Sequence, residues 1–155
     1  MDMLLREADR DGIEIIEEKK MPEALNGLSI ETETKKTIVL RDELNPVKKR
    51  EVLAHELGHQ HVGCPNLISC PAARGQYEYR ANYWAVKRLM PISRIISVYE
   101  RGARDTWEFA EMLGVSDEFF CGGIRIYRAK HATGLRFREY RISFEPFIIE
   151  KENTL

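Results

Sequence analysis

Hydrophobic positions along the chain follow two spacings, one typical of helices and one typical of strands. Apolar and small side chains recur every three or four residues over 46–61 and 77–90, which predicts two helices. Short β-branched or alternating runs at 13–17, 28–34 and 37–40 predict three strands before the first of these helices. The order of these segments indicates a small sheet followed by a pair of helices.

The two helices have recognisable ends. Asn45 is a suitable N-cap residue, and Pro46 would occupy the first helical position, where its missing N–H costs nothing. Gly63 and Pro65 are expected to end the first helix, and Pro91 is expected to end the second.

Local signals also appear at the start of the chain. Residues 3–10 are expected to form a short helix that ends near Gly12, and the Asn26-Gly27 dipeptide predicts a turn between the first two strands. Together with the strands and helices above, these segments indicate an α+β fold.

The C-terminal half reads as helices followed by strands. Ser93 is expected to cap a helix that runs to about Glu100, and Asp105 to cap another that ends at Gly114. Alternating hydrophobic positions within 124–149 suggest strands over parts of that segment.

The first long helix carries an HExxH motif, formed by His55, Glu56 and His59. Side chains four residues apart lie on one face of a helix, so the two imidazoles can bind one metal ion. The glutamate after the first histidine lies close to that face, where it can act as a general base. This arrangement is typical of zinc peptidases, with Glu56 as the catalytic residue.

A catalytic zinc site needs a third protein ligand, and Glu78 on the second helix is the candidate. Glu78, Ala81 and Ala85 fall on one helical stripe, and small residues there, like Gly58 on the first helix, allow two helix axes to approach closely. Glu78 would then reach the ion held by the histidines. The alternative is that Glu78 is an ordinary solvated helix residue.

Asn82 lies one turn after Glu78 on the same stripe. Its side chain could accept a hydrogen bond from the free ring N–H of a liganding histidine and so fix the tautomer of that ring. A polar core residue with a backbone partner is the alternative interpretation.

These two blocks resemble the ImmA/IrrE-type zinc peptidases. The resemblance rests on His55-Glu56-Leu57-Gly58-His59 and on the ExxAN sequence of the second helix, which ends in Leu89-Met90-Pro91. It implies a small zincin-like fold, a Zn²⁺ ion bound by both histidines and Glu78, and a helix-turn-helix transcriptional repressor as the substrate. Members of this family are often encoded beside phage-type repressors.

The chain also departs from the family pattern. Arg80 stands where an acidic or neutral polar residue is expected, and Cys64 and Cys70 are not a recognised feature of the family. The spacing of these two cysteines is wider than that of a usual structural zinc site. Cys121 is expected to be a small buried residue.

The oxyanion formed during peptide hydrolysis needs a further hydrogen-bond donor. His61, Tyr77 and Tyr79 are the candidates, because they lie near the proposed ligands along the chain. Each has a simpler alternative, an exposed position at a helix end for His61 and packing for the tyrosines.

Length and composition fit a single domain of 155 residues, with a catalytic core over 1–91 and a helical and β part over 92–155. With a formal net charge of −1, the chain lacks the excess positive charge that is typical of nonspecific nucleic-acid binding. No apolar run approaches the roughly 20 residues that span a bilayer. The chain begins without the apolar core of a signal peptide, so a cytoplasmic location and no membrane partner are expected.

Two other functions stay open. One is a binding protein that sequesters a repressor without cutting it, and the intact HExxH argues against this function. The other is a DNA-binding regulator, because the sequence around Gly114 resembles the turn of a helix-turn-helix unit. However, Asp117 and Glu118 would place negative charges close to the phosphates of DNA. A structural helix pair is therefore the preferred interpretation of that segment.

Overall fold

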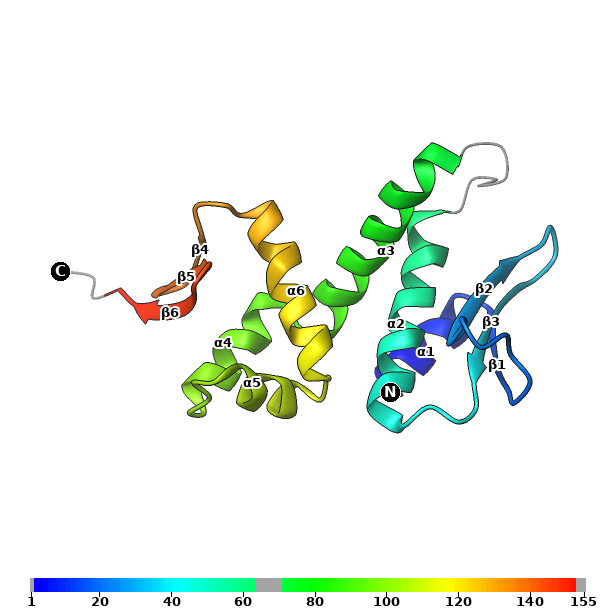
Figure 1. Ribbon diagram of the computed structural model, residues 1–155, viewed down its shortest axis with the longest axis horizontal. Helices are drawn as coiled ribbons and strands as arrows, with labels where there is room; N and C mark the ends of the chain where they lie inside the picture. Colours follow the sequence, from blue (N-terminus) through cyan, green and yellow to red (C-terminus); the bar gives the residue numbers. More distant parts are fainter. Residues whose placement is uncertain (1, 64–70, 153–155) are drawn as a thin grey trace. The chain divides into compact units, whose positions relative to one another are not determined.

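The computed structural model describes residues 2–63 and 71–152 (Figure 1). Its internal contacts divide the chain into two compact units, Met1–Ala85 and Val86–Leu155. Both contain helices and a small three-stranded sheet, so the fold class is α+β, as predicted. That the whole chain forms one domain stays a prediction.

The first unit contains a mixed sheet with the spatial order β1-β3-β2. The strands are β1 (Ile13–Glu18), β2 (Gly27–Glu31) and β3 (Lys36–Arg41). β3 pairs with β1 in parallel and with β2 antiparallel, so β2 lies at an edge of the sheet. The predicted strands are confirmed, but β2 ends before the predicted Thr34, because Thr32 and Lys35 close a tight turn with a backbone hydrogen bond of 2.8 Å.

Three helices accompany this sheet. They are α1 (Asp2–Arg10), α2 (Pro46–Val62) and α3 (Arg74–Leu89), and the short 3₁₀ helix η1 (Pro71–Ala73) precedes α3. Helix α2 packs on β2 and β3, and α1 contacts β1 and α2 (Figure 1). The core between these elements consists of aliphatic side chains that are almost fully buried: Leu4, Ala8, Ile38, Leu40, Leu53, Ala54 and Leu57.

Strand β2 presents its hydrophobic side chains outward. Leu28 and Ile30 are 42% and 41% exposed, whereas Gly27 and Ser29, with the opposite orientation, face α2. The face of β2 that contacts the HExxH helix is therefore made of small and polar residues.

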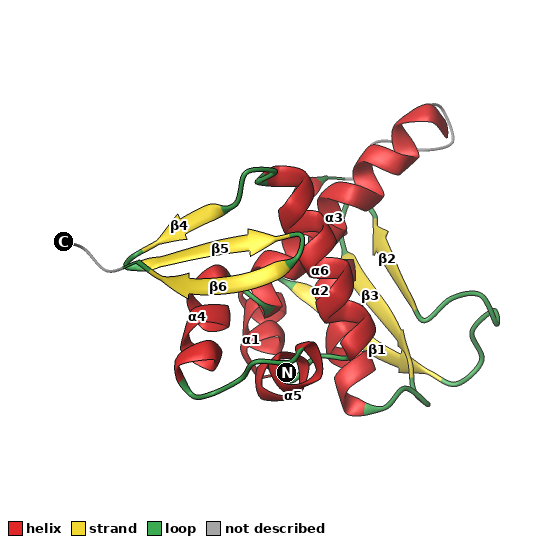
Figure 2. Cartoon of the chain, turned by 60° about the vertical axis from the view of Figure 1, so that its left-hand side comes forward, coloured by secondary structure: helices red, strands yellow, loops and turns green. Residues whose placement is uncertain are grey.

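The second unit contains α4 (Ile92–Glu100), α5 (Thr106–Leu113) and α6 (Asp117–Lys130), followed by a meander of β4 (Leu135–Phe137), β5 (Tyr140–Phe144) and β6 (Phe147–Lys151). Both strand pairs are antiparallel (Figure 2). Phe109, Phe120 and Phe147 join α5, α6 and β6, with ring centroids 5.2–5.6 Å apart.

Some predictions for the second unit are confirmed and others are wrong. Asp105 caps α5 through a capping box with Glu108, and Gly114 ends the helix in a left-handed conformation with φ 71°. Ser93 does not cap α4, because the helix begins at Ile92 with Pro91 in the cap position. The residues 124–130, predicted to contribute to strands, belong to α6.

The wrong assignment of 124–130 has a local cause. The Ser116 side chain caps α6 by accepting a hydrogen bond from the Phe119 N–H at 3.1 Å, and Asp117 and Glu118 follow in the first turn, where they favour a helix. Gly123 does not interrupt the helix. It allows close packing instead, since a Cβ at Gly123 would lie 2.5 Å from the Met90 sulfur.

Candidate metal centre

Helix α2 begins and ends where its sequence predicts. The Asn45 side chain accepts a hydrogen bond from the Lys48 N–H at 2.9 Å, and Pro46 is the first helical residue. Gly63 follows the last turn with φ 74°, a backbone conformation that favours glycine. Pro65, the second predicted stop signal, lies outside the described residues. These ends keep His55 and His59 within one continuous helix, one turn apart.

The structure brings His55, His59 and Glu78 together. The two Nε2 atoms are 3.0 Å apart, and the Glu78 carboxylate oxygens lie 3.3 Å from His55 Nε2 and 3.4 Å from His59 Nε2. A tetrahedral zinc ion with bonds of about 2.0–2.1 Å separates its donor atoms by about 3.3 Å. The three donors are therefore spaced as one metal ion requires, and their residue types are those that bind zinc.

Electrostatics at this centre favours the neutral form of His59. Burial lowers the pKa of His59, and the neighbouring charge of His55 lowers it further, although the Glu78 carboxylate acts in the opposite direction. Since only a neutral imidazole nitrogen can bind a metal, this environment suits ligation.

Close contact between α2 and α3 places Glu78 beside the histidines. A Cβ atom at Gly58 would lie 2.6 Å from the Ala81 carbonyl oxygen and 3.0 Å from the Ala81 Cα. The backbones of the two helices therefore touch at this point, with no room for a larger residue. Ala81 is one turn from Glu78, so the contact holds the carboxylate within reach of α2.

Asn82 contacts the histidine that begins the motif. Its Oδ1 atom lies 2.9 Å from His55 Nδ1. When Nδ1 carries the proton and donates it to this oxygen, Nε2 keeps a free lone pair that faces His59 and Glu78. Asn82 thus occupies the position expected for a residue that fixes the His55 tautomer.

Glu56 lies in a different environment from Glu78. Its side chain is buried, with 7% of the residue exposed. Burial and the negative charge of Glu78 raise the pKa of Glu56 to about 7, and a hydrogen bond from the Ser29 backbone N–H lowers it in part. A carboxyl group with a pKa near neutrality can both accept and return a proton.

The Glu56 side chain packs against strand β2, a contact that no sequence motif indicates. A Cβ at Gly27 would lie 2.9 Å from both the Cγ and the Oε1 atoms of Glu56, so only glycine leaves room for this side chain. Next to it, the Gln60 side-chain amide donates a hydrogen bond to the Ser29 hydroxyl. In the sequence, the Asn26-Gly27 dipeptide predicts only a turn, and no local signal connects Ser29 with the helix.

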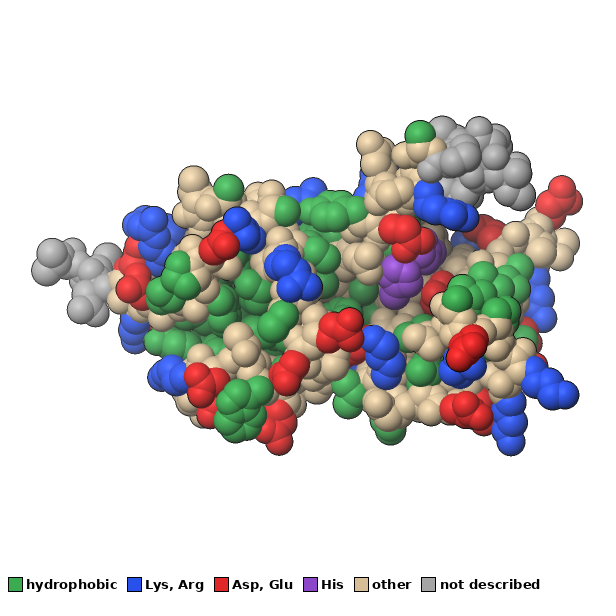
Figure 3. Space-filling model, in the orientation of Figure 1, with side chains coloured by type: hydrophobic (Ala, Val, Ile, Leu, Met, Phe, Trp, Pro, Cys, Tyr) green, Lys and Arg blue, Asp and Glu red, His purple; other side chains and the backbone are tan. Residues whose placement is uncertain are grey.

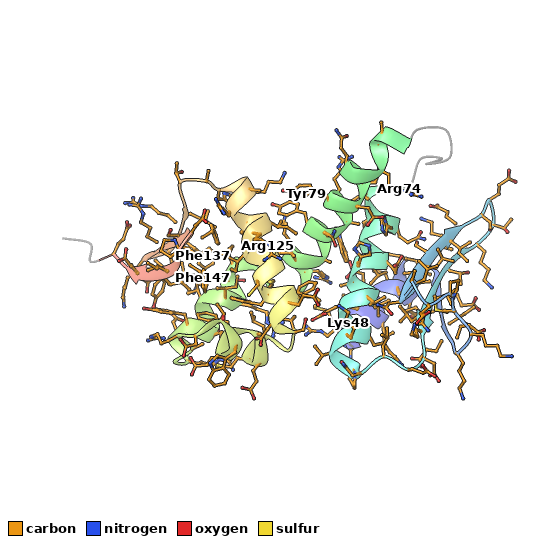
Figure 4. All side chains as sticks on the ribbon, viewed as in Figure 1. Lys48, Arg74, Tyr79, Arg125, Phe137 and Phe147 are labelled. Carbon is orange, nitrogen blue, oxygen red and sulfur yellow. The ribbon has the colours of Figure 1, made fainter. Side chains whose placement is uncertain are left out.

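The candidate oxyanion donors are spread over different environments. His61 contacts Glu7 and Asp11 and stacks on Trp84, with ring centroids 4.7 Å apart. Tyr77 is partly buried, and Tyr79 is 37% exposed on the side of α3 away from α2 (Figure 4). The oxyanion role of these three residues stays a prediction.

The space-filling view shows histidine side chains at the surface beside a carboxylate (Figure 3). Cys64 and Cys70 lie outside the described residues, so their role stays a prediction. Cys121 is a free cysteine and is partly exposed, not buried as predicted. In the described part of the chain, no helix is long and apolar enough to cross a membrane.

Comparison with known proteins places this centre in context. The model of a peptidase family, described as the IrrE N-terminal-like domain, matches residues 8–125 and so includes His55, His59 and Glu78. No curated protein matches the chain.

Among solved structures, a Mycobacterium tuberculosis transcriptional regulator has a similar fold, with a TM-score of 0.64 and 20% sequence identity. The match covers 97% of this chain but 47% of that protein, so the chain spans about half the length of the regulator. At this identity, the similarity shows the fold alone.

Proposed function

Because the chain belongs to the peptidase family with an IrrE N-terminal-like domain, we propose that it is a zinc-dependent endopeptidase that cleaves a helix-turn-helix repressor. The observation that carries the proposal is the convergence of His55, His59 and Glu78, with donor atoms 3.0–3.4 Å apart, next to the buried Glu56. Three protein ligands leave a fourth position open, as catalytic zinc sites require.

His55, His59 and Glu78 would hold the ion, and zinc, when bound, supplies a Lewis acid that polarises a carbonyl and acidifies water. Glu56 acts as the general base and general acid. It takes a proton from the attacking water and returns it to the leaving nitrogen, for which its pKa of about 7 is well suited.

The surroundings of Glu56 support its role as general base and general acid. Gly27 leaves space for the carboxyl group, and the Ser29 backbone N–H holds it by a hydrogen bond. Asn82 orients His55 from the other helix. Each of these contacts fixes a reacting or liganding group before substrate arrives, which lowers the cost of ordering the site.

An extended substrate can add to the sheet at β2. In the described sheet this strand pairs with β3 alone, and it is the edge strand that packs on α2. Main-chain hydrogen bonds to its open edge would lay an extended peptide beside the metal centre. The enzyme should therefore cut an unfolded segment of its substrate, and cleavage confined to rigid helices would contradict this arrangement.

A regulatory role without cleavage is the second candidate function. It is favoured by one observation, that a structurally similar protein is named a transcriptional regulator. In this alternative the chain would bind a repressor and relieve repression while leaving the repressor intact. DNA binding is less well supported, because Asp117 and Glu118 lie at the start of α6, the second helix of the helix pair.

The substitution Glu56→Gln separates cleavage from sequestration. We expect this variant to bind as much zinc as the unmodified chain but to lose cleavage of candidate repressors, tested first on any encoded beside its gene. Glu43→Gln, at an exposed turn position, is the matched control and should cleave normally. Zinc content by atomic absorption and product mapping by mass spectrometry give the two readouts.

A reporter assay for repression completes this test. If Glu56→Gln relieves repression as fully as the unmodified chain, proteolysis is not the activity and sequestration is the better explanation. Salt-dependent binding to duplex DNA, measured at low ionic strength, would instead support a DNA-binding regulator.

A further inference from the structure

A second group of metal-ligating side chains lies in the first unit. Glu7 belongs to α1, Asp11 follows the end of α1, and His61 is in the last turn of α2. One ligand atom from each residue lies within 4.8 Å of the other two. The His61 Nε2 atom is 3.5 Å from Glu7 Oε1 and 3.5 Å from Asp11 Oδ2.

This group is separate from the centre described above. His59 and His61 are two residues apart on α2, so their side chains leave the helix in directions that differ by roughly 200°. No ligand of the first centre takes part in the second group. An ion at His61 would therefore be additional to the one bound by His55 and His59.

Two features make the group more than a pair of surface acids. Glu7 is 8% exposed, so its carboxylate is held in a largely dehydrated position. The His61 ring is stacked on Trp84 with an interplanar angle of 16°, which fixes the direction of Nε2. The Asp11 N–H donates to the Glu7 carbonyl oxygen at 3.0 Å, so Asp11 lies one turn after Glu7, and both carboxylates face this nitrogen.

Arg10 is one competing cation in this region, and the charge of Lys36 also acts on Asp11. The Arg10 Nε atom binds Asp11 Oδ1 at 3.0 Å, while Asp11 Oδ2 is the oxygen that faces His61. The Arg10 guanidinium also lies 3.7 Å from Glu7 Oε1. However, 68% of the Arg10 side chain is exposed, and it contacts the two carboxylates through its guanidinium group. Arg10 can therefore move away without disturbing packed residues.

We infer that Glu7, Asp11 and His61 form a second divalent-metal site, which links α1 to the C-terminal end of α2. The two nitrogen-to-oxygen separations of 3.5 Å are close to the donor spacing of about 3.3 Å expected around zinc. One imidazole and two carboxylates are suitable ligands for Zn²⁺, which is the ion to test first. Because the site has no part in the proposed chemistry, its expected role is to hold α1 in place.

The test uses the full chain with the first centre removed by His55→Ala and His59→Ala. Only His61 and His131 remain of the four histidines in this variant, and alkylation of the three cysteines removes thiols as ligands. Isothermal titration calorimetry with Zn²⁺ should show that this variant binds one equivalent. Adding His61→Ala or Asp11→Asn should abolish that binding, whereas His131→Ala, the matched control, should leave it unchanged.

Circular dichroism shows whether each variant is folded. If the double variant does not fold, Asp11→Asn in the unmodified chain should reduce bound zinc from two equivalents to one. An absence of zinc binding by the folded double variant would overturn the inference, as would one equivalent that persists after both His61→Ala and Asp11→Asn. Since the double variant has no first centre, its zinc binding does not depend on whether the protein is a peptidase.

Discussion

The two glutamates nearest the histidines differ in the environment that each backbone position provides. Glu78 has 47% of its side chain exposed, and its two carboxylate oxygens lie 3.3 and 3.4 Å from the Nε2 atoms of His55 and His59, a position suited to ligation. Glu56 is buried against β2, where its pKa is raised to about 7. Pairs of acids in contrasting surroundings commonly divide the roles of fixed charge and proton carrier.

Removal of the Asn82 side chain should weaken metal binding without unfolding the protein. Because Asn82 accepts from His55 Nδ1 at 2.9 Å, its loss frees the imidazole to rotate and to change tautomer. We expect Asn82→Ala to lower zinc affinity about 10- to 100-fold. Competition with a chromophoric chelator measures the affinity of each variant.

Two further variants control this measurement. Asn82→Asp keeps an oxygen acceptor for His55 and should restore most of the affinity, whereas Asn26→Ala, an exposed asparagine, should have no effect. Equal zinc affinity in Asn82→Ala and the unmodified chain would show that Asn82 does not position His55.

At the scale of helices, the separation of α2 and α3 determines whether the metal centre can form. Gly58→Ala would place a methyl group 2.6 Å from the Ala81 carbonyl oxygen, which is backbone and cannot rotate away. We expect this substitution to push the helices apart, to lower stability by about 1–3 kcal/mol and to weaken zinc binding. Denaturant unfolding and chelator competition measure the two effects.

Gly75 provides the matched glycine control on α3. A Cβ atom there has no neighbour within 4 Å, so Gly75→Ala should be neutral or should stabilise the helix by up to about 1 kcal/mol. Its zinc affinity should be unchanged. If Gly58→Ala behaves like Gly75→Ala in both measurements, close contact of the helices is not required for the site.

The capping box of α5 predicts a pH effect. Glu108 accepts hydrogen bonds from the backbone N–H groups of Asp105 and Arg104, at 2.9 and 2.8 Å, and these bonds lower the pKa of Glu108 below 4.5. A lowered folded pKa means that the cap contributes to stability above about pH 4.5 and loses that contribution as the pH falls through the folded pKa.

Carboxyl NMR titration measures this pKa directly. The Glu108 resonance should titrate with a midpoint below 4.5. Glu108→Gln should lower the melting temperature at pH 7, and this difference should shrink in acid, whereas Glu111→Gln, an exposed change on the same helix, should have little effect at either pH. A Glu108 midpoint at or above 4.5 would contradict the capping geometry.

Local signals determined most of what the sequence could predict about the elements. Asn45, Asp105 and Gly114 act within a few residues of their own positions, so their caps could be identified from the sequence. The alternation in 124–149 was misleading over its first residues, because the cap at Ser116 and the packing of the helix decide the structure there.

The candidate site shows the same distinction between local and distant contacts. His55, Glu56 and His59 share one helix, and the small residues of α3 indicated a helix contact that would bring in Glu78. The position of the Glu56 side chain depends on contacts with Gly27 and Ser29. These two residues are distant from Glu56 in the sequence, and no motif connects them with it. The same limit applies to His61, whose partners Glu7 and Asp11 lie about fifty residues earlier.

At the scale of the whole molecule, all proposed metal ligands belong to the unit Met1–Ala85. The unit Val86–Leu155 has a core of its own, built around the aromatic side chains of Phe109, Phe120 and Phe147. Metal binding should therefore act first on the stability of the unit that holds the HExxH helix, and its effect on the second unit should depend on helix α3, which crosses the boundary.

Removal of the metal should lower the melting temperature of the protein. A ligand that binds only the folded state stabilises it by about 2.7 kcal/mol when its concentration is 100 times its dissociation constant. For a chain of this length, that corresponds to a rise of roughly 5–10 °C, at about 2–4 °C for each kcal/mol. Differential scanning calorimetry in zinc and in EDTA measures the shift.

His59→Ala identifies how much of that shift comes from the first centre. The imidazole of His59 is one of three ligands there. We therefore expect this variant to lose most of the rise in melting temperature that zinc at this one site provides. His131→Ala, in the second unit, should retain the full rise. An equal rise in His59→Ala and the unmodified chain would mean that zinc stabilises the protein at some other position, and the HExxH centre would then lose its thermodynamic support.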